Sequence, residues 1–278
     1  MKKILAITLA ICMIAGIIQA QKAYIRLGVG GGISLKQYEG AQWTDETSTS
    51  STDNLVIKSM GLGGGFNVNL GVGYMLSKYV GIELGVNEFI GLNKKAHYSS
   101  TTNNTTYSSD AKLSGMMLQI IPAIVITPGL EKMNPYARFG MIVGVLPSIT
   151  ESTSSTANIS GEYKVTTSSE SKIKLSGGVA LGFTAAAGVD FNLSKKLVFF
   201  TELVFNGVTY APSKGKISEF TIDGVDKLSD LTTKEKEWTF ETKFDADEAI
   251  PSGSPDKQEK MSLNYSNVEL NIGIKLKL

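Results

Sequence analysis

Seven stretches of the chain alternate apolar residues with polar residues or glycine, an eighth is less regular, and this pattern constrains the fold more than any other feature. In the last stretch, NVELNIGIKLKL (residues 267–278), every even position from 268 onward is apolar and every odd position is polar or glycine. Because successive side chains of a β-strand point to opposite faces, a period of two predicts strands. The other stretches lie at about residues 23–35, 66–76, 80–86, 118–126, 136–145, 178–193 and 197–206, and 118–126 is apolar on both faces.

The connections between these stretches are alternately long and short. Those after the second, fourth and sixth stretches are short, at residues 77–79, 127–134 and 194–196. Those after the first, third, fifth and seventh are long and polar, at about residues 36–59, 94–112, 150–172 and 212–261. Long structureless connections are unusual in a compact soluble domain. Short turns at one end and long loops at the other are typical of barrels in the bacterial outer membrane.

Physical constraints favour a closed barrel over a soluble β-sandwich, which would also alternate. A strand of about 9–11 residues tilted near 45° crosses the hydrocarbon core. In lipid every backbone polar group needs a partner, so the sheet must close without a free edge. The sequence therefore predicts an all-β fold, an eight-stranded antiparallel up-and-down transmembrane β-barrel with four long extracellular loops and three short periplasmic turns.

The N-terminus has the layout of a secretory signal peptide. Lys2 and Lys3 precede a mostly apolar run that ends at Ala20, where we expect cleavage. The interpretation is thus a signal peptide at residues 1–20 and one outer-membrane barrel domain at 21–278, with a retained transmembrane helix as the less favoured alternative. Cys12 is the only cysteine, so the mature chain would form no disulfide. The 27 basic and 26 acidic residues nearly cancel, and nothing in this balance indicates nucleic-acid binding.

Three motifs carry a resemblance to a known family. MLSKYVGIELGV (75–86) and FNLSKKLVFFTELVF (191–205) each join two strands by a short turn and carry a glutamate in the second strand, and MNPYARFGMIVGV (133–145) opens with a Pro-Tyr pair. With the last stretch, they make the chain resemble the small outer-membrane β-barrel proteins of Gram-negative bacteria, the OmpA-, OmpX- and OmpW-like "porin family". The resemblance spans the chain after residue 20 and implies a location in the outer membrane.

The resemblance also implies a C-terminal insertion signal. The barrel-insertion machinery of such families reads a last strand of the form polar-x-Gly-x-x-aromatic-x-aromatic. Asn271, Gly273, Leu276 and Leu278 match this spacing, although leucine replaces the aromatic residue at both final positions.

Four charged residues are expected inside the barrel. Arg26 and Arg138 are the only arginines, and by the alternation they point inward on the first and fifth strands, whereas Glu83 and Glu202 point inward on the third and seventh. An eight-stranded barrel has an interior just wide enough for its side chains, and charges buried there must be paired. We hypothesise a lumen charge layer of alternating sign near the periplasmic side, with Glu269 as a further candidate, that blocks conduction. The alternative is that these are scattered polar residues of the lumen.

No catalytic, cofactor or metal site is predicted. His97 is a lone histidine among serines and lysines, which favours a solvated residue over a member of a catalytic dyad. The glycine clusters at 28–32 and 61–65 lack the Gly-Lys-Ser/Thr ending of a phosphate-binding loop. The spacing of Asp223, Asp226 and Asp230, and of Asp245, Asp247 and Glu248, does not match a calcium loop. The sequence therefore predicts a protein that is not an enzyme.

The fourth long connection contains two short alternations, KISEFTI (216–222) and KEWTFETKF (236–244). They suggest that the seventh and eighth strands extend beyond the membrane as a hairpin. Candidate contact residues in the loops are Trp43, Phe220, Trp238 and Phe240.

The predicted function is a structural or surface-interaction role exerted through the long extracellular loops of a monomer. The expected partners are outer-membrane lipid and lipopolysaccharide, the barrel-insertion machinery and an unidentified surface ligand, with no nucleic acid. The alternative is a narrow porin-like channel for small or hydrophobic solutes.

Overall fold

The computed structural model describes residues 23–35, 51–57, 61–102, 105–159, 165–243 and 250–278. These residues form one sheet of sixteen strands, a short 3-10 helix η1 (Leu228–Asp230) and a one-turn helix α2 (Thr233–Lys236). No helix among them is long and apolar enough to cross a membrane. The expected signal peptide at residues 1–20 lies outside the described residues, as do Trp43, Asp245, Asp247 and Glu248.

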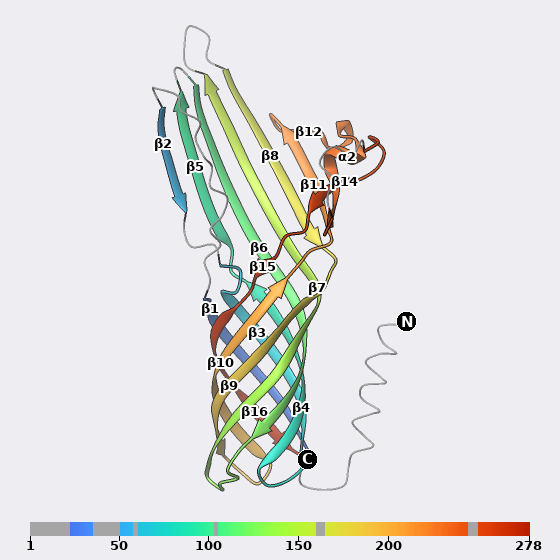
Figure 1. Cartoon of the computed structure of the whole chain (residues 1–278). Coiled ribbons are helices and arrows are strands. Elements are labelled where there is room, and N and C mark those ends of the chain that lie inside the picture. The colour runs from blue at the N-terminus through green and yellow to red at the C-terminus, as the bar shows by residue number, and fades with distance from the viewer. Residues whose placement is uncertain (1–22, 36–50, 58–60, 103–104, 160–164, 244–249) are drawn as a thin grey trace.

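Eight of the strands pair in a closed circuit. Each of them pairs antiparallel with the one before and the one after it in the chain, and the last pairs with the first. Figure 1 shows this circuit as the lower part of the molecule. Its members are β1 (Ala23–Ser34), β3 (Gly65–Met75), β4 (Val80–Gly91), β6 (Thr105–Ile126), β7 (Met133–Ile159), β9 (Ala180–Asn192), β10 (Leu197–Tyr210) and β16 (Asn267–Lys277).

Three connections at one end of the circuit are short turns, at residues 76–79, 127–132 and 193–196. Two of them use the same Leu-Ser-Lys sequence in the same way. The hydroxyl of Ser77 accepts hydrogen bonds from the backbone N–H groups of Tyr79 and Val80, both at 3.1 Å. The hydroxyl of Ser194 accepts from those of Lys196 and Leu197, at 3.3 and 3.0 Å. Local serine bonds of this kind stabilise tight turns.

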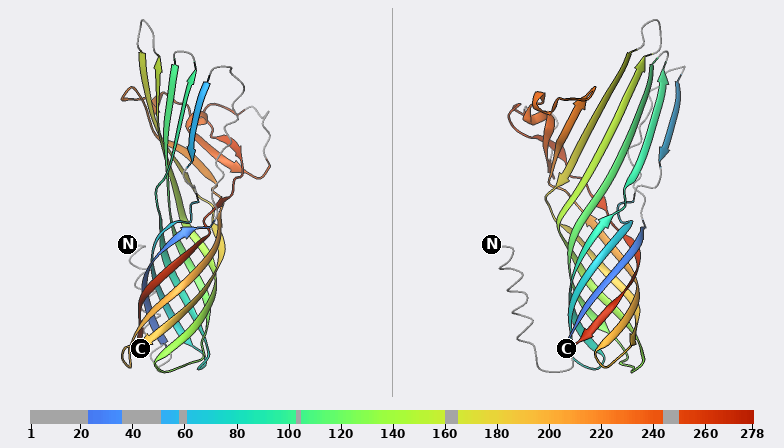
Figure 2. Two further views of the ribbon diagram at one scale, coloured as in Figure 1. Left: turned by 90° about the vertical axis from the view of Figure 1, so that its left-hand side faces the viewer. Right: turned by 180° about the vertical axis from the view of Figure 1, so that it is seen from behind.

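The expectation of eight strands joined by structureless outer loops is wrong, because the other eight strands lie in the segments interpreted as loops. β6 and β7 continue beyond the circuit, and the sheet widens around them in the order β2-β5-β6-β7-β8-β11-β13-β14. Figures 1 and 2 show this outer sheet rising from the end opposite the short turns. The added strands are β2 (Ser51–Ile57), β5 (Lys94–Thr102), β8 (Val165–Ser176), β11 (Lys214–Ile222), β12 (Val225–Asp226), β13 (Glu237–Glu241), β14 (Asp256–Glu259) and β15 (Leu263–Asn264).

The seventh and eighth barrel strands, β10 and β16, were expected to extend together beyond the membrane, and this expectation is also wrong. β10 and β16 do not extend together as a hairpin, since β10 ends at Tyr210 and β11 turns away to pair with β8. Only the two residues of β15 continue the pairing with β10. The alternations at 216–222 and 236–244 do correspond to strands, β11 and β13, which pair with each other. The open edge of β8 therefore takes the place of the expected partner.

The circuit is polar inside and apolar outside, as the alternation predicts. On β16, Leu270 is 60 % and Ile272 is 46 % exposed, whereas Glu269, Asn271 and Lys275 between and beyond them are buried. The same reversal of the usual soluble pattern runs around the other seven strands of the circuit. A wall of this kind suits a lipid surrounding, because its backbone groups are paired and its exposed face is apolar.

The stretch at 118–126 looks apolar on both faces because three of its inward residues, Ile121, Ala123 and Val125, are apolar. Ile121 belongs to an apolar cluster inside the circuit. Met117 and Ile121 on β6 and Ile142 on β7 are buried there. The whole cluster, named here the apolar cap, comprises Leu62, Phe89, Met117, Ile121, Ile142, Ile149, Ala180, Val208, Tyr210, Leu263 and Tyr265. It lies at the end of the circuit from which the outer sheet rises.

Candidate functional site: the interior of the barrel

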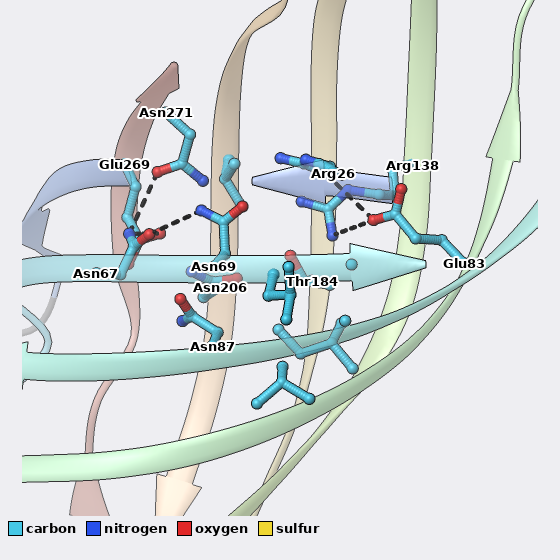
Figure 3. Close-up of a pocket in the computed structure, with 16 residues that line it drawn as sticks. Arg26, Asn67, Asn69, Glu83, Asn87, Arg138, Thr184, Asn206, Glu269 and Asn271 are labelled. Carbon is cyan, nitrogen blue, oxygen red and sulfur yellow. Dashed lines mark hydrogen bonds and ion pairs between the residues drawn. The ribbon is translucent and has the colours of Figure 1, made fainter. Parts of the chain in front are cut away.

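The four charged residues of the hypothesised layer meet inside the circuit. Arg26 on β1 contacts Glu83 on β4 at 3.3 Å and also forms an ion pair with Glu202 on β10. Arg138 on β7 contacts Glu202 at 2.9 Å and Glu83 at 3.7 Å. All four side chains are almost fully buried, and they come from alternate strands of the circuit. Each carboxylate thus bridges two guanidinium groups, and Figure 3 shows both arginines converging on Glu83.

Two tyrosines complete this layer in matching positions. The hydroxyl of Tyr24 donates to Glu83 at 2.8 Å, and the hydroxyl of Tyr136 donates to Glu202 at 2.9 Å. Each tyrosine stands one glycine away from its glutamate across the sheet, so the rows read Tyr24–Gly73–Glu83 and Tyr136–Gly188–Glu202.

The glycine in each row has a steric reason. A Cβ at Gly73 would lie 2.1 Å from the Tyr24 ring, and one at Gly188 would lie 2.6 Å from the Tyr136 ring. Each ring therefore lies across a glycine to reach the next strand. These tyrosines were not among the predicted interior residues, although both precede an arginine in the same Tyr-x-Arg-x-Gly context.

A layer of amide side chains lies next to the charge layer. Glu269 belongs here: its carboxylate accepts from Asn67 at 2.8 Å and from Asn267 at 2.7 Å. Asn271 joins the two layers, since its side chain accepts from Asn67 at 3.2 Å and donates to Glu202 at 3.2 Å. The carboxylate of Glu269 is thus hydrogen-bonded by amide groups in the layer next to the charge layer, and not by the arginines. The remaining buried polar residues of this layer are Asn87, Gln119, Thr184 and Asn206.

Small residues make room for the amide layer. A Cβ at Gly30 would lie 1.5 Å from the side-chain oxygen of Asn271, so no other residue fits there without displacing the amide. A cavity of about 30 Å³ remains between the amide and charge layers, which is room for about one or two water molecules. Figure 3 shows its lining, with Asn67 reaching toward Glu269 and Asn271.

The interior is bounded at both ends. Toward the short turns, Lys275 forms an ion pair with Asp190 at 2.8 Å, and its ammonium group lies 4.0 Å from the ring centre of Tyr136. Toward the outer sheet, the apolar cap follows the amide layer, with Tyr265 in edge contact with Phe89 and with Tyr210 at 5.9 and 6.3 Å between ring centres.

The four residues of the expected insertion signal lie on both faces of β16. Asn271 is buried in the amide layer, and Gly273 lies on the same inward face. Leu276 and Leu278 are 44 % and 42 % exposed on the outward face. Their placement next to lipid is the one that aromatic residues would occupy.

The loop contact candidates that the structure describes lie in the outer sheet. Phe220 is on β11, and Trp238 and Phe240 are on β13; each is half-buried. The Trp238 ring covers Gly215 of β11, where a Cβ would lie 2.2 Å from the indole. These aromatic residues therefore pack the two strands together as well as presenting a surface.

The residues weighed for other chemistry stay apart from the interior. His97 lies 2.8 Å from Asp110, and both side chains are exposed on the outer sheet. Asp223 accepts a hydrogen bond from the backbone of Ser168, and Lys227 donates to Asp230, which lowers the pKa of that carboxyl group. Within the described part of the chain, no three histidine, cysteine or acidic residues cluster as metal ligands would.

Comparison with known proteins places the chain in a family. The family model for the outer membrane protein beta-barrel domain matches residues 8–223. No curated protein matches the chain. Among solved structures, Neisserial surface protein A (NspA) is similar at 7 % identity and a TM-score of 0.34, with 92 % of this chain and 97 % of that chain covered.

Two further solved structures are similar. The attachment invasion locus protein Ail of Yersinia pestis, solved with the heparin analogue sucrose octasulfate, has 9 % identity and a TM-score of 0.30 over 92 % of this chain and 99 % of that one. Acinetobacter baumannii CarO has 13 % identity and a TM-score of 0.29 over 94 % and 100 %. Because the family model covers most of its residues, the chain belongs to the outer membrane β-barrel domain family and is a protein of the outer membrane.

Proposed function

We propose that the circuit of eight strands is the membrane-spanning barrel of a non-catalytic, monomeric surface protein whose outer sheet makes its external contacts. The three short turns face the periplasm and the outer sheet faces the outside, which is the usual orientation of bacterial barrels. Residues 1–20 direct export and are removed, and the last strand, with Asn271, Gly273, Leu276 and Leu278, is read by the insertion machinery.

The observation that carries the surface role is the size and polarity of the outer sheet. Serine, threonine and charged residues occupy most of β5, β8 and the outer halves of β6 and β7. Such strands have little apolar area with which to form a core of their own, and they stay ordered because they continue the hydrogen-bond ladders of the barrel wall. A rigid polar platform held above the membrane suits the recognition of a surface ligand, with Phe220, Trp238 and Phe240 as aromatic contacts.

The stacked interior layers support a closed lumen. The charge layer joins four strands across the barrel, the amide layer lies beside it, and the apolar cap fills the outer mouth. The cavity between the layers holds about 30 Å³, too little for a hydrated ion. We therefore propose that the barrel does not conduct, and that the network of polar lumen residues serves to hold its strands together.

Topology is tested with single cysteines introduced into the mature chain, because the full sequence has cysteine only at Cys12, within the proposed signal peptide. Ser154→Cys lies in the outer part of β7 and Ser194→Cys in a short turn. An impermeant maleimide should label the first on intact cells and the second only after the outer membrane is permeabilised. Labelling of Ser194→Cys on intact cells would show that the short turns face the outside, and would contradict the proposed orientation.

The closed lumen is tested by conductance. Purified protein in planar bilayers should show no steps at the nanosiemens level. Steady conductance that falls when Glu202→Gln or Arg138→Gln is introduced would instead support the narrow porin-like channel.

A further inference from the structure

A group of lysines lies on the outward face of the outer sheet, directly beyond the apolar exterior of the barrel. On β6, Met116 is 50 % exposed on the outer face of the wall, and Lys112 lies further along the same face. Partners across antiparallel strands share a face. The pairing of Lys112 with Lys95 of β5, and through Ser152 with Lys172 of β8, therefore carries this face across four strands.

The next rows toward the membrane add three more lysines. Lys174 of β8 pairs with Lys216 of β11, and Lys214 lies two residues before Lys216 on the same face. The alternate residues Leu113 and Leu175 pack against the apolar cap, which shows that the lysines point away from the lumen. The lysine band is thus defined as Lys95, Lys112, Lys172, Lys174, Lys214 and Lys216.

Acidic residues on this face lie mainly further from the membrane. Glu219 shares a row with Lys172 and contacts it at 2.6 Å. Asp110 and Glu170 lie in the next row outward, joined through Ser154. Glu237 of β13 pairs with Lys216 and adds one carboxylate to the nearer rows. The rows nearest the barrel therefore carry an excess of lysine, and Asp110 and Glu170 lie further out.

Directly below the band, the wall ends in exposed apolar side chains. Met116 on β6 and Leu146 on β7 form this upper edge, and Leu146 is 83 % exposed at the bulge where β7 leaves the barrel register. The hydroxyl group of Ser152 stands between Lys112 and Lys172, and that of Thr150 lies beside Lys174. A molecule held here would meet an apolar edge, hydroxyl donors and several ammonium groups in sequence.

We propose that the lysine band binds the phosphate groups of lipopolysaccharide in the outer leaflet, with the acyl chains against the apolar edge below. Lysine binds phosphate as a strong point charge, and basic clusters at the headgroup level attract anionic lipid. The two-part surface fits a ligand with both acyl chains and phosphates. A soluble anion would use the lysines without the apolar edge.

The inference rests on the proposed function and its orientation in the membrane. The experiment is therefore made after cysteine labelling has established that the outer sheet faces the outside. Purified full-length protein is reconstituted in phosphatidylethanolamine vesicles containing either bisphosphorylated lipid A or the same lipid after removal of its phosphates. The protein is then re-extracted, and bound lipid A per chain is counted by mass spectrometry. Retention should be at least about tenfold higher for the phosphorylated lipid.

A matched pair of variants locates the site. Lys95→Gln, Lys112→Gln, Lys174→Gln and Lys216→Gln together remove four charges of the band, and retention should fall about tenfold. The control removes four lysines of the segment beyond β11, as Lys227→Gln, Lys234→Gln, Lys236→Gln and Lys260→Gln, and should retain lipid A like the natural protein. Heat-modifiable mobility on SDS gels verifies that both variants are folded.

Two results would overturn the proposal. One is equal retention of phosphorylated and phosphate-free lipid A by the natural protein, which needs no variant at all. The other is equal retention by the band variant and the control. Either result, on protein with the correct cysteine labelling, rejects the lipid site while the proposed barrel stands.

Discussion

β6 and β7 cross two regions of the molecule with the same backbone structure and different side-chain patterns. Within the barrel, their residues alternate between a buried interior and an apolar exterior. In the outer sheet the same strands carry mostly serine, threonine and charged residues on both faces. The register between them shifts only at the bulge near Met116. Alternation of apolar and polar residues therefore indicates that the two faces of a strand have different surroundings. A segment without this alternation can still be a strand.

The first way to sharpen this comparison is to remove an ion-pair partner in each region. Glu202→Gln should destabilise the protein by about 3–5 kcal/mol, because it leaves Arg26 and Arg138 without their shared carboxylate in a buried site. The free energy of unfolding is measured by urea titration in lipid vesicles. The outer-sheet control, Glu219→Gln, removes the exposed partner of Lys172 and should change it by about 0–1 kcal/mol. Equal changes in the free energy of unfolding for the two variants would contradict a stabilising role of the charge layer.

A second prediction compares exposed apolar residues in the two regions. Ile272→Arg, at the middle of β16, should destabilise the protein by about 2–4 kcal/mol, because it places a charge against lipid. Tyr107→Arg, on the outer sheet and similarly exposed at 41 %, should stay within about 0.5 kcal/mol. Folding into vesicles, followed by gel mobility and urea titration, provides the measurement. A mild effect at Ile272 would argue against lipid contact there.

A third prediction uses a glycine of the barrel interior. Gly30→Ala places a methyl group on the side chain of Asn271 and should cost about 1–3 kcal/mol. Gly253, with no neighbouring atom within 4 Å of its added methyl, serves as the control, and Gly253→Ala should be nearly neutral. Thermal unfolding in detergent is sufficient to rank the two. If Gly30→Ala were as mild as the control, the amide layer would be looser than its contacts indicate.

The smallest expected effect concerns salt. The exposed pair between Lys172 and Glu219 should weaken as ionic strength rises, because mobile ions screen it. The buried pair between Arg26 and Glu83 should be almost insensitive to salt. Comparing the destabilisation by Glu219→Gln at about 0.05 and 0.5 M salt tests the first statement, and the same comparison for Glu83→Gln tests the second. A strong salt dependence for Glu83→Gln would imply that water reaches the charge layer.

What could be predicted from the sequence was the face of each barrel residue. Parity along the strand was enough to point Arg26, Glu83, Arg138 and Glu202 inward, because the barrel wall separates lipid from the interior. Parity does not give height, which depends on strand tilt and register. Glu269 was therefore grouped with the arginines, whereas its carboxylate is held by Asn67 and Asn267.

The outer sheet could not be predicted for a different physical reason. Strands that are polar on both faces have weakly specified pairing, since a slip in register buries and exposes nothing new. The sequence around β5 and most of β8 thus offered no periodic signal. β11 does alternate, but its pattern does not indicate that its partner is β8. The apolar cap was hidden for another reason: its residues come from distant parts of the chain, and only Ile121 lies in the stretch at 118–126.

The length of β7 has a mechanical consequence. At about 3.3 Å per residue, its 27 residues run for about 90 Å as one strand from the turn end of the barrel to the far end of the outer sheet. A pull on the sheet is transmitted along β6 and β7 into the barrel wall, where it loads their ladder of hydrogen bonds in shear. Many bonds then share the force at once, whereas a load that peeled the strands apart would break them one by one. An adhesive contact made at the tip would be anchored as firmly as the barrel itself.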